Sequence, residues 1–80
     1  MDNTQKFRAA VAAILQIEED DITDTLSPDT ADTWDSLNHI NLLGALEEEF
    51  GVQFQAIAIE QTRSIPALKQ LLANQGITID

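Results

Sequence analysis

Apolar side chains recur every three or four positions near the start of the chain, which predicts a first helix. Asn3 or Thr4 is expected to cap this helix, because a short side-chain oxygen can accept a hydrogen bond from the unpaired backbone N–H groups of a first turn. The helix is expected to end near Ile17, since the acidic residues that follow would face the negative end of its dipole. Its apolar face consists of Phe7, Ala10, Val11, Ile14 and Leu15.

The helical period returns further along and predicts a second helix from Asp35 or Ser36 to Phe50, which Gly51 ends. Placing its residues at intervals of about 100° separates two faces. The predicted core face holds Leu42, Leu43, Leu46 and Phe50, with His39 beside it. The second face holds Ser36, Leu37, Ile40, Gly44, Glu47 and Glu48. Two large apolar residues on this face are not needed by the core and are rimmed by charge, so the face is a candidate docking surface.

Residues 18–35, between the two helices, are rich in Asp, Thr, Ser and Pro and show no sustained period. They predict a long acidic loop, a feature that is uncommon inside a compact domain and usually functional. Ile22 and Leu26 are expected to hold this loop against the core, and Trp34 is interpreted as a packing anchor at its end.

The last third of the chain predicts two further helical segments. Residues 52–63 are compatible with a short strand or a short helix, and a helical turn is favoured because no other segment offers a strand to pair with. Ser64 is expected to cap a last helix that tolerates Pro66 in its first turn and ends at Gly76. Its apolar stripe consists of Ile65, Leu68, Leu71 and Leu72, and Phe7, Phe50 and Phe54 are expected in the core. The pattern predicts an all-α bundle with three longer helices, one short helix and a long first loop.

The amino-acid composition excludes several classes of binding partner and functional site. The 80 residues are expected to form a single domain, 1–80, and Asp plus Glu outnumber Lys plus Arg by 14 to 4, which gives a net charge of −10. This balance argues against nucleic acid and anionic membranes as partners and favours proteins with basic patches. The absence of cysteine excludes disulfides, thiolate metal sites and a thiol nucleophile. With neither a basic-then-apolar leader nor an apolar stretch of about 20 residues, a cytoplasmic monomer is expected.

The sequence Asp35-Ser36-Leu37 stands where the long loop meets the second helix. A serine there is expected to be exposed beside the positive end of the helix dipole, which suits an attached phosphodiester. The alternative role for Ser36 is to cap the helix. A hydrolase built on Ser36 and His39 would require a nucleophile elbow and an oxyanion hole, and neither is visible, so His39 is interpreted as structural.

The acidic first loop also suggests calcium. However, an EF-hand loop starting at Asp20 would need Gly where Thr25 stands and Glu where Ala31 stands. A solvated acidic segment is therefore favoured, and neither a metal site nor a catalytic residue is expected in this chain.

The run Trp34-Asp35-Ser36-Leu37, followed by Ile40, Leu42, Leu43 and the segment ALEEEFG at 45–51, resembles the acyl carrier proteins over essentially the whole chain. The resemblance implies that a phosphopantetheinyl transferase uses coenzyme A and Mg²⁺ to join 4′-phosphopantetheine to Ser36, between Asp35 and Leu37. The thiol of that cofactor would hold acyl groups as thioesters for loading and processing enzymes. The carrier itself would not be an enzyme.

In such carriers the second helix is the main recognition element and meets Arg and Lys patches on partner enzymes. The resemblance implies that partners contact a set of residues that we call the docking face: Leu37, Ile40, Asn41, Gly44, Glu47 and Glu48. The chain departs from fatty-acid carriers in having Asn38 and Asn41 at positions that are usually acidic, Gly44 where a larger apolar residue is common, and Trp34 before the motif. These departures favour a discrete carrier of a specialised pathway, of the polyketide or mixed polyketide–peptide type.

Two alternatives remain open at this point. A peptidyl or aminoacyl carrier would share the fold and the cofactor, but Asp35 before the serine argues for acyl cargo. An acidic helical interaction module would carry no cofactor and would not depend on Ser36.

Overall fold

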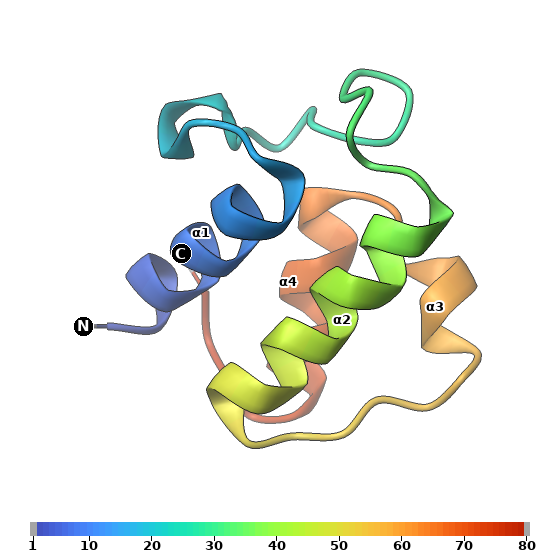
Figure 1. Ribbon diagram of the computed structural model, residues 1–80. Coiled ribbons are helices and arrows are strands. Elements are labelled where there is room, and N and C mark those ends of the chain that lie inside the picture. The colour runs from blue at the N-terminus through green and yellow to red at the C-terminus, as the bar shows by residue number, and fades with distance from the viewer. Residues whose placement is uncertain (1, 80) are drawn as a thin grey trace.

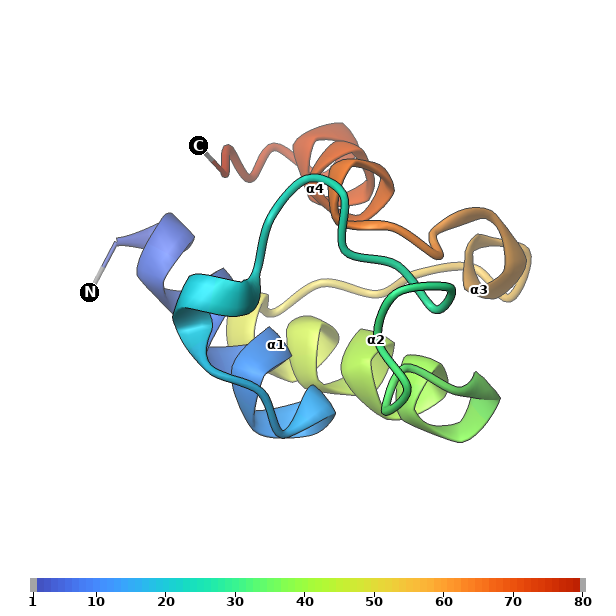
Figure 2. The same cartoon turned by 90° about the horizontal axis from the view of Figure 1, so that it is seen from above.

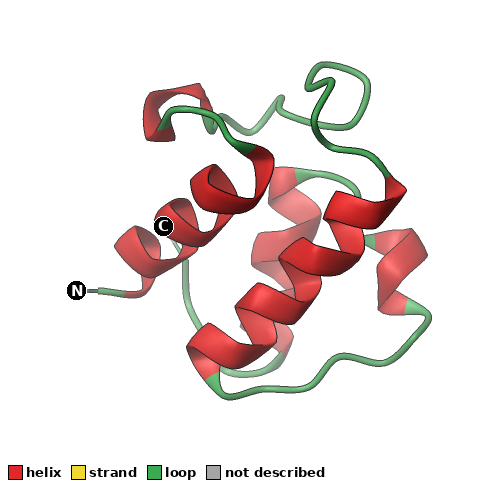
Figure 3. Cartoon of the chain, viewed as in Figure 1, coloured by secondary structure: helices red, strands yellow, loops and turns green. Residues whose placement is uncertain are grey.

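The structure, a computed structural model, describes residues 2–79; Met1 and Asp80 lie outside the described range. Within that range the elements are α1 (Asn3–Leu15), the 3₁₀ turn η1 (Glu19–Asp21), α2 (Ser36–Phe50), α3 (Ala58–Gln61) and α4 (Ile65–Asn74). The described residues form helices and loops without a strand (Figure 3). The predicted all-α bundle with one short helix is therefore confirmed, and residues 58–61 take the favoured helical form. No helix in the described range is long and apolar enough to span a bilayer.

The bundle packs α1, α2 and α4 around one apolar core, with α3 beside α2 (Figure 1). The fully buried side chains come from all three long helices and include Phe7, Val11, Leu15, Leu42, Leu46, Leu68 and Leu72. Phe50 and Phe54, predicted as core residues, are only partly buried and pack against its margin, as do Ile77 and Ile79 of the C-terminal segment.

The N-terminal cap of α1 differs from the prediction. Asp2, rather than Asn3 or Thr4, is the cap, and its Oδ1 accepts a hydrogen bond of 2.8 Å from the backbone N–H of Gln5. The helix also ends at Leu15, two residues earlier than expected. Gln16 adopts the left-handed conformation (φ 57°) and its N–H reaches Ala12 O, which closes the helix before the acidic residues begin.

The other helix ends lie at or near the positions predicted from the sequence. Gly51 (φ 66°) ends α2 in the left-handed region, where a side chain would be strained. Ser64 caps α4 by accepting a hydrogen bond of 3.2 Å from Ala67 N, and Gly76 (φ 84°) follows the last turn.

The long first loop crosses the end of the bundle between α1 and α2 (Figures 1 and 2). Ile22, Leu26 and Trp34 are buried, as predicted, and attach it to the core. Arg8 of α1 adds polar attachments, because its guanidinium donates to Ile22 O at 3.3 Å and also to Glu19 O. An ion pair of 3.2 Å joins Lys69 of α4 to Asp24. The loop thus leads to α2 along a defined path.

Two leucines on α2 provide a matched test of this packing. Leu46 is fully buried and Leu37 is 68% exposed. We expect Leu46→Ala to lower the free energy of unfolding by about 2–5 kcal/mol, because it removes transfer energy and leaves a cavity. We expect Leu37→Ala to change it by less than about 0.5 kcal/mol. Urea unfolding followed by circular dichroism measures both, and equal losses would contradict the packing described.

Candidate functional site

The candidate site begins with the cap of α2. Asp35 lies in extended backbone, and its Oδ1 accepts a hydrogen bond of 2.8 Å from Asn38 N, while its carbonyl accepts one from His39 N. Ser36 is consequently the first helical residue. The alternative that Ser36 caps the helix is wrong, because the Asp35 carboxylate satisfies that N–H group.

The Ser36 side chain is exposed at this helix start. Among the described residues its hydroxyl has no hydrogen-bond partner. The leading N–H groups of a helix lack partners within it, and they face outward together with the positive end of the dipole. An exposed hydroxyl in this setting fits an attached phosphodiester, since the developing anion meets favourable backbone charge and no steric cover.

The docking face of α2 is largely open to solvent. Leu37 is 68% exposed and Ile40 is 51% exposed, so both apolar side chains are accessible to a partner. Asn41, Gly44 and Glu48 are exposed as well. Ile57, just before α3, is 61% exposed and adds a further apolar side chain on the α3 side.

Glu47 differs from the rest of the docking face because its carboxylate already has a partner. Its Oε2 accepts a hydrogen bond of 2.7 Å from the backbone N–H of Phe54, and the side chain is half-buried. Glu47 thus holds the segment after α2 in place. Glu48, the next residue, is more exposed to solvent than Glu47.

Two shallow grooves border the docking face. One, of about 190 Å³, lies between α2 and the segment leading into α3 and is lined by Ile40, Leu43, Gly44, Glu47, Phe54, Gln55, Ala56 and Ile59. A Cβ at Gly44 would meet no atom within 4 Å, so this position leaves open space on the helix. The other, of about 270 Å³, lies between α1 and α2 and is lined by Ala10, Ala13, Ile14, Ala45, Glu48 and Glu49.

Asn38 has a role that the sequence pattern did not reveal. Its Nδ2 donates a hydrogen bond of 2.8 Å to Thr33 O, and its Oδ1 accepts one of 3.4 Å from Asn41 Nδ2. Asn38 therefore ties the end of the loop to the first turn of α2. A carboxylate at this position has no donor for Thr33 O, so the amide explains the departure from an acidic residue.

His39 is buried and both of its ring nitrogens are engaged. Trp34 Nε1 donates to His39 Nδ1 at 3.0 Å, and Thr62 Oγ1 lies 3.3 Å from Nε2. Burial lowers the pKa of His39, the charge of Arg63 adds to this effect, and a hydrogen bond with the backbone of Ile59 opposes it. Neither nitrogen is available to Ser36, which agrees with a structural histidine and not with a hydrolytic pair.

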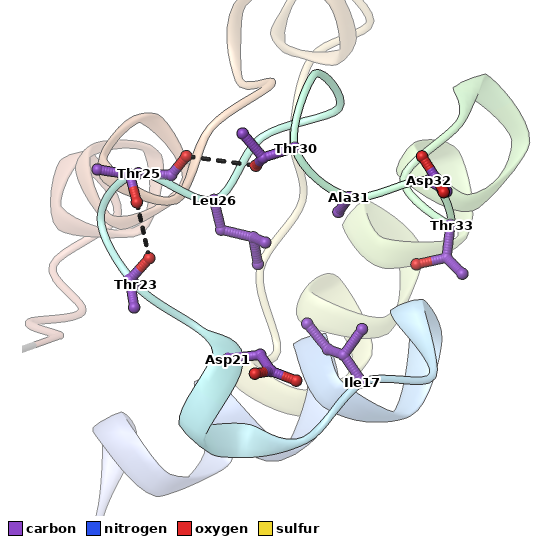
Figure 4. Close-up of a pocket in the computed structure, with 9 residues that line it drawn as sticks. All are labelled: Ile17, Asp21, Thr23, Thr25, Leu26, Thr30, Ala31, Asp32 and Thr33. Atoms are coloured by element: carbon purple, nitrogen blue, oxygen red, sulfur yellow. Dashed lines mark hydrogen bonds between the residues drawn. The ribbon is translucent and has the colours of Figure 1, made fainter.

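A hollow of about 430 Å³ lies under the first loop (Figure 4). It is lined by Ile17, Asp21, Thr23, Thr25, Leu26, Thr30, Ala31, Asp32 and Thr33. The Thr33 hydroxyl is buried there without a hydrogen-bond partner in the described range. Ser36 does not line this hollow, and residues 2–79 contain no cluster of three or more His, Asp or Glu side chains that could hold a metal ion.

Comparison with known proteins decides the family. The family model described as the phosphopantetheine attachment site matches residues 5–72, which include all of α2 and α3 and most of α1 and α4. The chain belongs to the phosphopantetheine-binding carrier proteins. No individual curated protein matches it closely enough to refine this assignment.

Membership in the family establishes the general chemistry. The cofactor is 4′-phosphopantetheine, which such carriers hold covalently on a serine. Carrier domains of this kind are generally non-catalytic and interact with a phosphopantetheinyl transferase and with biosynthetic enzymes. The helical bundle agrees with this family.

The cap at Asp35 offers a direct test of how the site is built. We expect Asp35→Ala to lower the free energy of unfolding by about 0.5–2 kcal/mol, because Asn38 N loses its acceptor. Asp35→Asn retains a side-chain oxygen at the cap and should retain most of the stability. Urea unfolding of the three proteins measures this. If Asp35→Asn lost as much as Asp35→Ala, charge rather than the hydrogen bond would be the cause.

Proposed function

We propose that the protein is an acyl carrier protein and that Ser36 is the residue that bears 4′-phosphopantetheine. The observation that carries this proposal is the state of the three serine hydroxyls. Ser27 Oγ accepts a hydrogen bond of 3.3 Å from Asp29 N, and Ser64 Oγ accepts one of 3.2 Å from Ala67 N. Ser36 is the exposed serine, and in the described residues its hydroxyl has no partner.

In the attachment reaction, the phosphopantetheinyl group moves from coenzyme A to the hydroxyl of Ser36. The bond from Ser36 Oγ to phosphorus forms, the pyrophosphate bond of coenzyme A breaks, and 3′,5′-adenosine bisphosphate leaves with the displaced oxygen. The hydroxyl proton passes to a base on the transferase. The chain contributes an exposed hydroxyl, a rigid helix start held by Asp35, and the backbone charge of the first turn. When bound, the cofactor supplies a thiol that holds acyl groups as thioesters.

The docking face supports partners that combine an apolar contact with basic residues. Leu37 and Ile40 form an exposed apolar centre, and Glu48 lies exposed about two to three turns further along α2. Charge complementarity of this kind mainly raises association rates and weakens with salt, which suits a carrier that must leave each enzyme. The partners proposed are the transferase and enzymes that load or process the acyl group.

We also propose acyl rather than peptidyl cargo, in a specialised pathway of the polyketide type. Asp35 before the serine supports acyl cargo. The first half of α2 carries Asn38 and Asn41 in place of acids, and Asn38 faces the loop instead of a partner. A partner of this carrier therefore has less need of basic residues near Ser36 than the partner of a fatty-acid carrier.

Intact mass spectrometry tests the attachment site. After incubation with coenzyme A, Mg²⁺ and a broadly specific transferase, the wild-type chain should gain one phosphopantetheine group. Ser36→Ala should gain none. Ser27→Ala and Ser64→Ala are matched controls and should be modified like the wild type. If well-folded wild type gained nothing, the carrier proposal would be refuted and the acidic interaction module would take its place.

A charge reversal tests the docking face. We expect Glu48→Lys to lower kcat/KM of the transferase by about tenfold or less, mainly through KM, because a rim charge acts on association. Asp20→Lys makes the same charge change in η1, away from α2, and should have little effect. The kinetics are measured at low and high salt, and the difference should shrink at high salt. Equal effects of the two substitutions would mean that only net charge matters.

A further inference from the structure

A buried chain of hydrogen bonds crosses three segments of the molecule around His39. Trp34 Nε1, at the end of the first loop, lies 3.0 Å from Nδ1 of His39 in α2. On the other side of the ring, Nε2 lies 3.3 Å from Oγ1 of Thr62, which directly follows α3. Thr62 Oγ1 in turn donates to Ala58 O at 2.6 Å. The side chains of Trp34, His39 and Thr62 are all buried.

The donors in this chain fix the protonation state of the ring. An indole N–H can only donate, so Nδ1 of His39 must carry its lone pair. The single proton of the neutral imidazole is therefore on Nε2 and points towards Thr62 Oγ1. The hydroxyl proton of Thr62 is already used on Ala58 O, so its oxygen is free to accept. The bonds from Trp34 to His39 to Thr62 to Ala58 therefore run in one direction, and the backbone of Ile59 is a further hydrogen-bond partner of the ring.

A second proton on His39 cannot be accommodated in this arrangement. The only open position is Nδ1, where a new N–H would face the Trp34 N–H across 3.0 Å. Two donors at that distance repel, and neither side chain has another acceptor to offer. Proton binding to His39 and the bond to Trp34 thus exclude each other.

The surroundings of the ring also disfavour its charge. The buried residues of α1 and α4 are all apolar. The charged residues nearest in sequence to Trp34 and Thr62 are Asp32, Asp35, Glu60 and Arg63, and all four are exposed. Arg63 opposes a second positive charge, and no described carboxylate is hydrogen-bonded to the ring. A charged imidazole here would be buried without a counter-ion.

We propose that His39 is a positioning residue for Ser36 and acts as a proton-controlled latch. The neutral ring holds the loop end, α2 and α3 together, and a proton on Nδ1 releases Trp34 and opens this end of the bundle. Trp34 lies two residues before Ser36 and His39 three residues after it, so release loosens the backbone on which Ser36 sits. The effect on Ser36 rests on the proposed function, whereas the latch itself does not.

The sign of the pH dependence follows from burial. The folded pKa of His39 lies below the ordinary histidine value of 6.5, so below that value the unfolded chain binds the proton more readily than the folded chain. The contribution of the latch to stability is complete above 6.5 and is lost as the pH falls through the folded pKa.

Spectroscopy of the unmodified chain tests the latch. Trp34 is the only tryptophan, so its fluorescence and its indole N–H signal report on the bond, while nitrogen NMR of the imidazole reports the tautomer and the titration. Between about pH 8 and pH 5, we expect a neutral ring protonated on Nε2 and a midpoint below 6.5. Protection of the indole N–H from exchange should be lost at the same midpoint. A ring that titrates while the indole N–H stays protected would overturn the latch.

His39→Asn is the matched variant. Its Oδ1 can replace Nδ1 as the acceptor for Trp34, but it cannot be protonated. The fluorescence transition should therefore be absent from the variant across the same range, and a transition with an unchanged midpoint would also overturn the latch. The wild-type NMR titration needs no substitution, so it decides the question even if the variant folds poorly.

Modification kinetics test the positioning role. The ratio of kcat/KM for His39→Asn to that for wild type cancels the transferase's own pH dependence. This ratio should rise as the pH falls, by about tenfold per pH unit once the pH is well below the midpoint. A constant ratio alongside the spectroscopic transition would overturn the positioning of Ser36. A lack of modification in both proteins at every pH would refute the proposed function, with the latch decided by spectroscopy.

Discussion

The burial of Trp34 is the constraint on which the arrangement around Ser36 depends. The first loop has no long regular element and is strongly acidic, so it has little of its own to hold it. The indole, only 2% exposed, fixes where that loop ends and therefore where α2 begins. Asp35 then caps the helix, and Ser36 is left outside the core one residue later.

Helical spacing in the sequence was sufficient to predict the bundle. The spacing of Phe7, Val11 and Leu15, and of Leu42 and Leu46, matches the buried stripes of α1 and α2. Gly51 and Ser64 also marked their helix ends correctly, because backbone conformation and capping are local effects. The family model matches residues 5–72 and therefore supports the resemblance to carrier proteins that the sequence motif indicated.

Contacts between segments far apart in the sequence could not be predicted in the same way. The bond from Phe54 N to Glu47, and the bond between Thr62 and His39, join residues that meet only once the helices have packed. The helix caps show a subtler limit. Asp2 and Asp35 were each neighbours of other short polar residues, and the choice among them depended on how the preceding backbone enters the helix.

The contacts made by the basic side chains affect how copies of the protein interact with one another in solution. Two of the four basic residues are engaged with the first loop: Arg8 donates to the backbone carbonyls of Glu19 and Ile22, and Lys69 forms an ion pair with Asp24. The net charge of −10 is therefore presented outward against very little positive surface. Copies of this chain repel each other at moderate salt. This repulsion opposes self-association and becomes more important as the carrier becomes more concentrated.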